Sequence, residues 1–107
     1  MDLVNQFEVF LIGLNPTKRS EIKKTRHCVV ISPNELNHHL KTVIIVPMTT
    51  TRKNYPFRVK CAFKGKHADI ALDQLRAVDK SRLIKKIGKI KPTEAETCLQ
   101  MLQEMFA

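Results

Sequence analysis

The segment from Pro16 to Arg26 carries the densest group of side chains that could do chemistry in this chain. It reads Pro-Thr-Lys-Arg-Ser-Glu-Ile-Lys-Lys-Thr-Arg, and the apolar run Cys28-Val-Val-Ile follows it. Among its groups are a carboxylate, two hydroxyls and a strand-anchored guanidinium that could act together: Glu21, Ser20, Thr25 and Arg26. A basic, polar loop between two strands suits an anionic ligand, and its groups could also perform acid–base chemistry on a phosphate ester.

The charge of the chain points to a polyanionic partner. Lysine and arginine number 19 against 10 acidic residues, which gives a net charge of +9 and a pI of about 9.8. The basic residues cluster within residues 18–26, 52–66 and 80–91, and the last two stretches contain no acid. Three such runs in one small domain predict a shared basic surface that binds nucleic acid or an acidic protein tail.

Length and composition predict one folded domain over residues 1–107. No run of about 18 apolar residues is present, so no membrane span is expected, and the first residues lack the basic start of a signal peptide. We therefore expect a cytoplasmic protein. The three cysteines are odd in number, widely spaced and flanked by apolar residues, which predicts buried thiols. Cys28 follows Arg26 and His27 and is the one candidate for a catalytic thiol.

Apolar and alternating patterns predict a mainly β fold (α+β) that ends in a helix. Strands are expected over residues 7–14, 27–32, 42–47, 55–61, 68–72, 74–78 and 83–90, and Pro47 is expected to end the third. Thr93 and Glu96 match a capping box at the start of an amphipathic C-terminal helix. Short strands with a terminal helix predict a small β-barrel or strongly bent sheet, with short helical connections, capped by that helix.

Four blocks of sequence give the chain a family resemblance. They are Glu8-Val-Phe-Leu-Ile with Asn15-Pro-Thr; Ser20-Glu-Ile-Lys-Lys-Thr-Arg26; Val46-Pro-Met-Thr-Thr50 with Tyr55-Pro-Phe; and Leu72-Asp-Gln-Leu-Arg-Ala-Val-Asp-Lys-Ser-Arg82 with Ile87-Gly88. In this order and spacing they resemble the MazF/PemK/Kid family of toxin endoribonucleases, from about residue 7 to residue 106. The resemblance implies an SH3-like barrel and a homodimer. It also implies metal-independent cleavage of single-stranded mRNA at short preferred sequences, without a cofactor, and neutralisation by an antitoxin with an acidic, partly disordered segment.

The chain departs from the family pattern at four positions. His27 stands where proline is usual, and Phe10 where tryptophan is common. Some members have an arginine and a histidine where this chain has Ala71 and Ser20. The form of the mechanism that uses that pair does not carry over, whereas the form that uses an arginine and a threonine does.

The resemblance, together with side-chain chemistry, assigns three candidate catalytic roles. Arg26 would hold two phosphate oxygens through its planar guanidinium. Thr49 would donate its hydroxyl to the phosphate, and Thr50 would take this role if the alignment slips by one residue. Glu21 is a candidate general base, although charge balance in a basic loop explains it equally well. Cleavage would proceed by attack of the 2′-hydroxyl and leave 2′,3′-cyclic phosphate and 5′-hydroxyl ends.

Further residues are candidates for RNA contact. Phosphate contacts are expected from basic side chains, namely Lys18, Arg52 and Lys53. Polar contacts are expected from Ser20, Thr25, Thr50, Asp73 and Gln74, although the Asp-Gln pair could instead fix a neighbouring loop through buried hydrogen bonds. Tyr55 and Phe57 could stack a base, or Phe57 could belong to the core.

The histidines are weaker candidates. Histidine suits proton transfer near neutral pH, but His27 follows Arg26 directly in a strand and is expected to point to the opposite face. His38 and His39 lack further ligands nearby in sequence, so no metal site is predicted.

Two other functions fit the sequence. One is a toxin of the same fold that poisons a protein target, such as DNA gyrase, and cuts no RNA. The other is a basic barrel that binds RNA or DNA without catalysis. Cleavage products would separate the nuclease from both.

Overall fold

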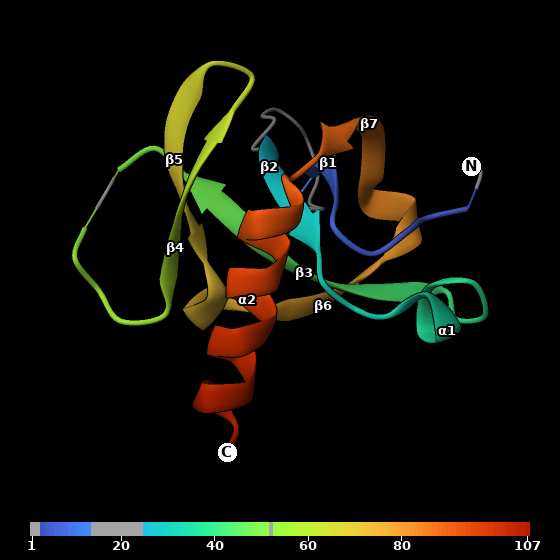
Figure 1. The fold of residues 1–107 in the computed structure, drawn as a ribbon. Coiled ribbons are helices and arrows are strands. Elements are labelled where there is room, and N and C mark those ends of the chain that lie inside the picture. Colours follow the sequence, from blue (N-terminus) through green and yellow to red (C-terminus); the bar gives the residue numbers. More distant parts are fainter. Residues whose placement is uncertain (1–2, 14–24, 52) are drawn as a thin grey trace.

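Antiparallel strands dominate the computed structural model, which describes residues 3–13, 25–51 and 53–107 (Figure 1). In chain order the elements are β1 (Glu8–Gly13), β2 (Thr25–Val30), α1 (Asn34–Asn37), β3 (Thr42–Thr49), β4 (Arg58–Phe63), β5 (Lys66–Ala71), the 3-10 helix η1 (Leu72–Gln74), β6 (Arg76–Asp79), the 3-10 helix η2 (Lys80–Arg82), β7 (Leu83–Lys89) and α2 (Pro92–Met105). No helix in the described part of the chain is long and apolar enough to cross a membrane.

The strands form one curled sheet in the order β4-β5-β3-β2-β1-β7. β3 is the central strand, because it pairs with β2 on one edge and with both β6 and β5 on the other. Two register shifts between β1 and β7 add local twist at the other end of the sheet. The sheet therefore bends into a partly closed barrel, with α2 lying across it (Figure 1). The predicted mainly β fold with a C-terminal helix is confirmed.

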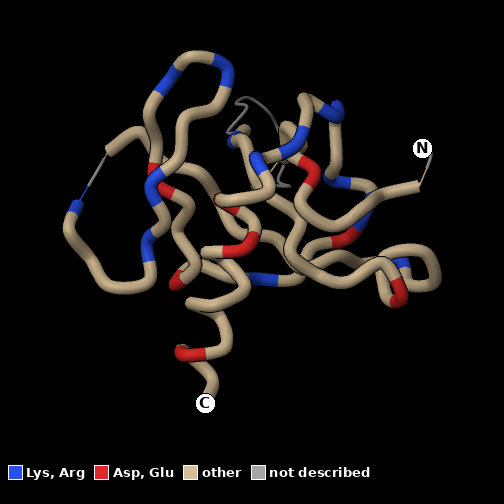
Figure 2. The backbone as a smooth tube through the Cα atoms, in the orientation of Figure 1, with Lys and Arg blue, Asp and Glu red and all other residues tan. Residues whose placement is uncertain are grey.

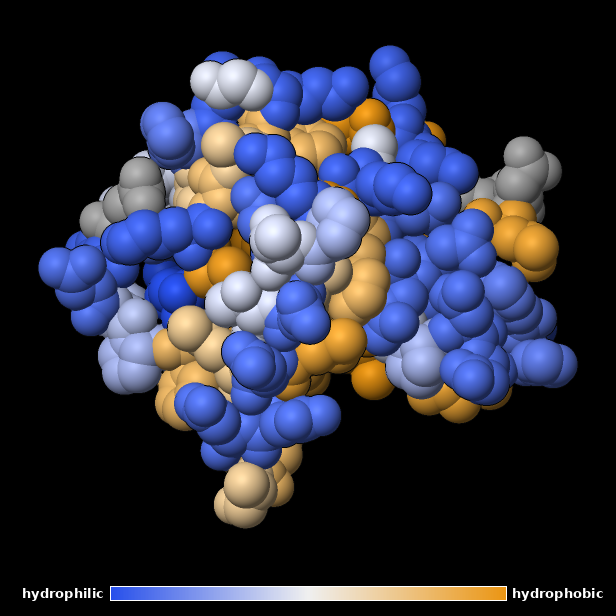
Figure 3. Space-filling model, viewed as in Figure 1, coloured by the Kyte–Doolittle hydropathy of each residue, from blue (hydrophilic) through white to orange (hydrophobic). Residues whose placement is uncertain are grey.

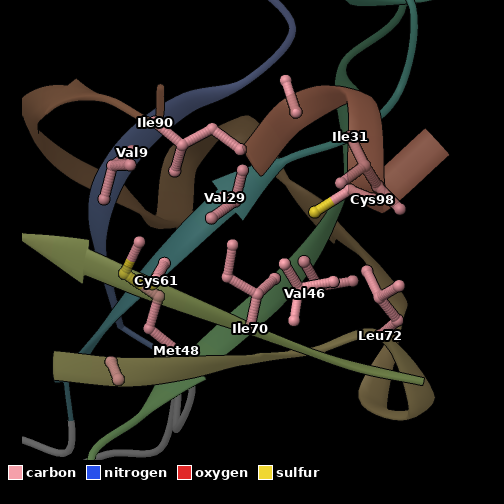
Figure 4. Packing of buried hydrophobic residues seen from close by; sticks show 13 residues of the cluster. Val9, Val29, Ile31, Val46, Met48, Cys61, Ile70, Leu72, Ile90 and Cys98 are labelled. Atoms are coloured by element: carbon pink, nitrogen blue, oxygen red, sulfur yellow. The ribbon is translucent and has the colours of Figure 1, made fainter. Parts of the chain in front are cut away.

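The second half of β2, Cys28–Val30, is buried on both faces, which explains its unbroken apolar run. Val29 packs in a cluster that joins the sheet to Ala95 and Cys98 of α2 (Figure 4). Cys28 and Val30 point the other way, into a second cluster. Because successive side chains on a strand alternate between faces, a strand between two cores needs apolar residues at every position.

Pro47 does not end the third strand, so that expectation is wrong. β3 continues to Thr49, and Pro47 pairs with Cys28 of β2. On its other edge β3 pairs with β6 through residues 42–45 and with β5 through residues 48–49. Pro47 lies between these two stretches, where its missing N–H removes no described pairing with β5 or β6.

The C-terminal helix begins earlier than predicted. Its N-cap is Lys91, Pro92 is its first residue, and Glu94 rather than Glu96 lies at the third helical position. Glu94 Oε1 accepts a hydrogen bond from the backbone N–H of Lys91 at 3.1 Å. Its Oε2 accepts one from the N–H of Ala62 in β4 at 3.2 Å. Proline favours the first helical position, which explains the start at Pro92. The hydrogen bond from Ala62 of β4 to Glu94 further stabilises this start, and the predicted Thr93–Glu96 capping box gave no sign of it.

The strand predicted over residues 55–61 begins at Arg58. Residues 56–57 form a turn before it, and Phe57 has a positive φ of 60°. This left-handed backbone conformation is incompatible with an extended strand. The other predicted strands correspond to β1, β2, β5, β6 and β7, with shifted ends.

Candidate active site

A hollow of about 450 Å³ opens where the ends of several strands meet. Its lining comes from β2 (Arg26, His27), from β3 and the following loop (Met48, Thr49, Thr50, Thr51), from the β4–β5 hairpin (Phe63, Lys64, Lys66, Ala68) and from β7 (Ile87). Met48 and Ala68 are buried and Ile87 is partly buried, whereas the threonines and basic residues supply polar groups. Within the described residues no carboxylate lines this hollow. It therefore offers a pocket with an apolar part and an excess of positive charge, which suits a nucleotide.

Thr49 is the last residue of β3 and is oriented by the loop that follows it. Its Oγ1 accepts a hydrogen bond from the backbone N–H of Thr51 at 3.2 Å. A threonine hydroxyl has one proton to donate in addition to its lone pairs. With a lone pair engaged by Thr51, that proton is available to a ligand oxygen in the hollow.

The loop after Thr49 is anchored by a buried carboxylate. Asp69 pairs with Thr49 across the β3–β5 ladder and is 1% exposed. Its Oδ2 accepts a hydrogen bond from the N–H of Lys53 at 3.3 Å. Asp69 thus connects β5 to the middle of the β3–β4 loop that carries Thr50 and Thr51. An isolated acid in the run Ala-Asp-Ile-Ala gave no sign of this role in the sequence.

Arg26 and His27 both line the hollow, although they are neighbours in β2. Their Cα partners in β1 are Ile12 and Leu11 respectively. His27 lies on the same face of β2 as Val29, and its ring meets Phe63 edge-on, with centroids 6.2 Å apart and planes at 68°. The two side chains lie on opposite faces of β2, as expected, yet both line the hollow. Strand alternation holds, but the curled sheet places His27 inside the hollow as well as Arg26.

The β4–β5 hairpin contributes residues that the sequence did not identify as part of a site. Phe63 and Lys66 are Cα partners across the hairpin, and Lys64 lies at its turn. Lys64 and Gly65 both have positive φ, 52° and 79°. Basic residues gather at this hairpin and along β7 (Figure 2). The only sequence signal for these residues is the basic Lys64-Gly-Lys run.

Comparison with known proteins identifies the family. Residues 5–106 match the model of a protein family described as "PemK-like, MazF-like toxin of type II toxin-antitoxin system". The chain belongs to this family. The endoribonuclease toxin MazF of Escherichia coli K12 is 30% identical over 90 residues, which cover 83% of this chain and 81% of that protein. The family resemblance expected from the sequence is therefore confirmed.

Solved structures have the same fold as this PemK-like chain. MazF from Deinococcus radiodurans superposes with a TM-score of 0.81 at 19% identity, covering 99% of this chain and 98% of the other. A mycobacterial endoribonuclease in complex with its cognate antitoxin gives 0.82 at 19% identity, covering 96% and 94%. At this level of identity the likeness establishes the architecture.

Several predicted contact residues lie outside the hollow of this PemK-like chain. The Tyr55 ring is 52% exposed and has the Arg58 guanidinium carbon 4.8 Å from its centroid and Lys53 Nζ at 5.9 Å. Phe57 is partly buried and packs against the core, as the alternative had it. Gln74 is exposed at the end of η1 and does not line the hollow.

Asp73 is paired with a strand residue rather than fixing a loop through buried bonds. Its Oδ1 and Oδ2 accept hydrogen bonds from Nε and a terminal nitrogen of Arg58 at 2.7 and 3.1 Å. The guanidinium lowers the pKa of the Asp73 carboxyl and the carboxylate raises the pKa of Arg58. The Asp73 side chain is 42% exposed, whereas the Arg58 side chain is 7% exposed, so the pair lies at the edge of the protein interior with its carboxylate open to solvent. The alternative in which Asp73 fixes a loop through buried hydrogen bonds does not hold, since its carboxylate is solvent-exposed and bonds to Arg58 at the start of β4.

The remaining candidates divide into two groups. Thr25 is the exposed first residue of β2 and is absent from the lining of the hollow, whereas Thr50 is part of it. Lys18, Ser20, Glu21 and Arg52 lie outside the described residues. Among the residues that are described, no three His, Cys, Asp or Glu side chains gather in an arrangement that could hold a metal ion.

All three cysteines are buried, as predicted. Burial raises the pKa of the Cys28 thiol to about 12, despite the opposing charges of Arg26 and Arg76. The thiolate is the nucleophilic form of cysteine, so Cys28 is not set up as a nucleophile at neutral pH.

Proposed function

We propose that this chain is a sequence-preferring endoribonuclease toxin that cleaves single-stranded mRNA in the hollow beside β2, β3 and the β4–β5 hairpin. The observation that carries the proposal is that Arg26 and Thr49 line one hollow although they are 23 positions apart in the sequence. Family membership supports ribonuclease activity, because the Escherichia coli relative is an endoribonuclease toxin.

The proposed reaction is transesterification within the RNA. The 2′-oxygen forms a bond to the adjacent phosphorus, the bond from phosphorus to the 5′-oxygen breaks, and the products are a 2′,3′-cyclic phosphate and a 5′-hydroxyl. Arg26 would hold non-bridging oxygens as negative charge builds on them, and the Thr49 hydroxyl would donate to one of them. Because the nucleophile belongs to the substrate, the step as proposed needs no metal-bound water.

Two residues are candidates for the proton transfers. A base must remove the proton of the 2′-hydroxyl and a donor must protonate the leaving 5′-oxygen. Glu21 remains the candidate base from the sequence, and the position of His27 in the hollow makes its imidazole a second candidate for either transfer. Comparing the pH–rate profiles of Glu21→Gln and His27→Gln tests both assignments. A limb of the profile that disappears in one variant identifies that residue, and an unchanged profile removes it.

Partners follow from charge and from the relatives. The net charge of +9 suits an acidic, partly disordered antitoxin segment that folds on contact. Deinococcus radiodurans MazF is solved as a MazE–MazF complex, which supports a similar arrangement here. The toxin would act as a homodimer in the cytoplasm, where mRNA is found. Antitoxin binding should weaken as salt increases, and a salt-insensitive complex would count against charge as the driving force.

The first test is cleavage of a long single-stranded RNA in excess EDTA, with mapping of the new 5′ ends. The wild type is compared with Arg26→Ala and with Arg76→Ala, which removes an exposed arginine of β6 outside the hollow. Discrete cuts by the wild type and Arg76→Ala, but not by Arg26→Ala, would support the proposal. Intact RNA that binds tightly would indicate a binding module, and intact RNA without binding would indicate a protein-directed toxin.

A further inference from the structure

We propose that Phe63 and Lys64, at the tip of the β4–β5 hairpin, form a subsite for a nucleotide next to the cleaved bond. The base would stack on the Phe63 ring, and the phosphate would lie at the Lys64 ammonium. The inference rests on the proposed RNA cleavage and extends the substrate path beyond the site of chemistry.

The first observation is that two hollows share these residues. A second hollow of about 290 Å³ lies between the hairpin and the start of α2, and its lining includes Phe63, Lys64, Lys89 and Lys91. Phe63 and Lys64 also line the first hollow. A single strand leaving the catalytic hollow over the hairpin therefore passes directly from one basic depression into another.

The second observation is that neighbouring residues hold the partly buried Phe63 ring in place where it borders both hollows. One contact is with the His27 ring, which lies at a centroid distance of 6.2 Å in a T-shaped arrangement. Another is with the backbone of β7, because a Cβ built on Gly88 would lie 3.4 Å from Phe63 Cζ. Glycine at position 88 thus leaves room for the ring. A fixed aromatic ring that borders two hollows is a suitable platform for a base of any identity.

The third observation concerns the backbone of Lys64. The turn residues Lys64 and Gly65 both have positive φ, 52° and 79°. A two-residue hairpin turn of this kind favours asparagine, aspartate or glycine at its first position, so lysine is an unusual choice. Lys64 Nζ lies 6.0 Å from the Phe63 ring centroid. The turn therefore directs a cation over the same ring that would take the base, where the attached phosphate would follow.

The charges around the second hollow fit a phosphate backbone. Lys64, Lys89 and Lys91 are exposed cations on its lining. The carboxylate there, Glu94, is engaged by the backbone N–H groups of Lys91 and Ala62 through its two oxygens. Hydrophilic residues surround the apolar surface at the hairpin tip (Figure 3). The arrangement of an aromatic surface framed by lysines is typical of single-strand binding.

The test is binding of a fluorescein-labelled single-stranded RNA of mixed sequence in which every ribose is 2′-O-methylated. Such RNA has no 2′-hydroxyl to attack, so binding is measured independently of cleavage. Phe63→Leu keeps an apolar side chain against Gly88 but removes the ring face, and it should raise Kd roughly 5- to 150-fold. Lys64→Asn keeps a residue that tolerates positive φ, and it should reduce the slope of log affinity against log salt by about 0.7.

Matched controls separate the subsite from general effects. Lys60→Asn removes an exposed lysine of β4 that lines neither hollow, and Phe106→Leu removes an aromatic residue that is 70% exposed after α2. Both should bind as the wild type does. Thermal unfolding of each variant checks that the fold persists. Because Lys64 is exposed, the RNA binding of Lys64→Asn tests the subsite without a change in core packing.

The outcomes distinguish the two proposals. If the wild type cuts unmodified RNA and both subsite variants bind the methylated RNA like the controls, the subsite is overturned and the nuclease stands. If the wild type fails to cut while the variants lose binding as expected, the nuclease is overturned and the hairpin still binds RNA. Cleavage by the wild type, together with weaker RNA binding by Phe63→Leu and a reduced salt slope for Lys64→Asn, supports the subsite.

Discussion

Replacing Thr49 by valine is the sharpest test of the proposed chemistry, because it removes one hydroxyl and nearly preserves the side-chain shape. Two interactions disappear. One is the hydrogen bond that Thr49 Oγ1 accepts from the N–H of Thr51 at 3.2 Å. The other is the hydroxyl donation to a phosphate oxygen that we propose for the transition state.

The two losses differ in size. Thr51 is exposed, so water can satisfy its N–H, and the loss of one long neutral bond should cost folding less than about 1 kcal/mol. A hydrogen bond to a charged group contributes about 1.5–3 kcal/mol. The single-turnover cleavage rate should therefore fall roughly 10- to 150-fold, while the unfolding free energy changes little.

The assay is single-turnover cleavage of one mapped RNA site, with urea unfolding measured in parallel. Thr49→Ser keeps the hydroxyl and should retain a rate close to that of the wild type. Thr42→Val makes the same replacement at the exposed start of β3, outside the hollow, and should cleave normally. A wild-type rate for Thr49→Val would refute the reasoning, and a large loss in Thr50→Val would then transfer the role to that neighbour.

Three further predictions concern stability and reactivity. Arg58 lowers the pKa of Asp73, so this pair adds stability above the ordinary carboxyl pKa and loses it as pH falls through the lowered value. Asp73→Asn should be less stable than the wild type by at most about 1 kcal/mol near pH 7, and in urea titrations the difference should shrink as pH falls below the ordinary carboxyl pKa of about 4 and vanish only below the lowered pKa of Asp73. Glu94→Ala should lose about 1–2 kcal/mol because two backbone N–H groups lose their acceptor, whereas Glu96→Ala should change the unfolding free energy by under about 0.5 kcal/mol; equal losses would contradict the observed helix start. Because burial raises the Cys28 pKa to about 12, a thiol reagent at neutral pH should label Cys28 only after unfolding, and Cys28→Ala should still cleave RNA; rapid labelling of the folded protein would contradict this.

The sequence by itself determined most of the secondary structure. The run Cys28-Val-Val-Ile predicts a strand buried on both faces, and the second half of β2 is buried in this way. The apolar stripe of the last residues predicts the helix that packs Ala95 and Cys98 onto the sheet. These features are local, because the period of apolar residues along one segment records which of its faces is buried. The family blocks also placed Arg26 and Thr49 among the candidates, and both line the hollow.

Only the tertiary structure decided which other side chains share that hollow. His27, Phe63 and Lys64 line it, whereas Tyr55 and Asp73 lie outside it with Arg58 as their partner. Whether each of these side chains lies inside or outside the hollow depends on how strongly the sheet curls. It also depends on the register in which strands distant in sequence pair. A side-chain period of two fixes the face of a strand on which a residue lies, but not what lies opposite that face. The long-range pairing of β3 with β2, β5 and β6 supplies that information.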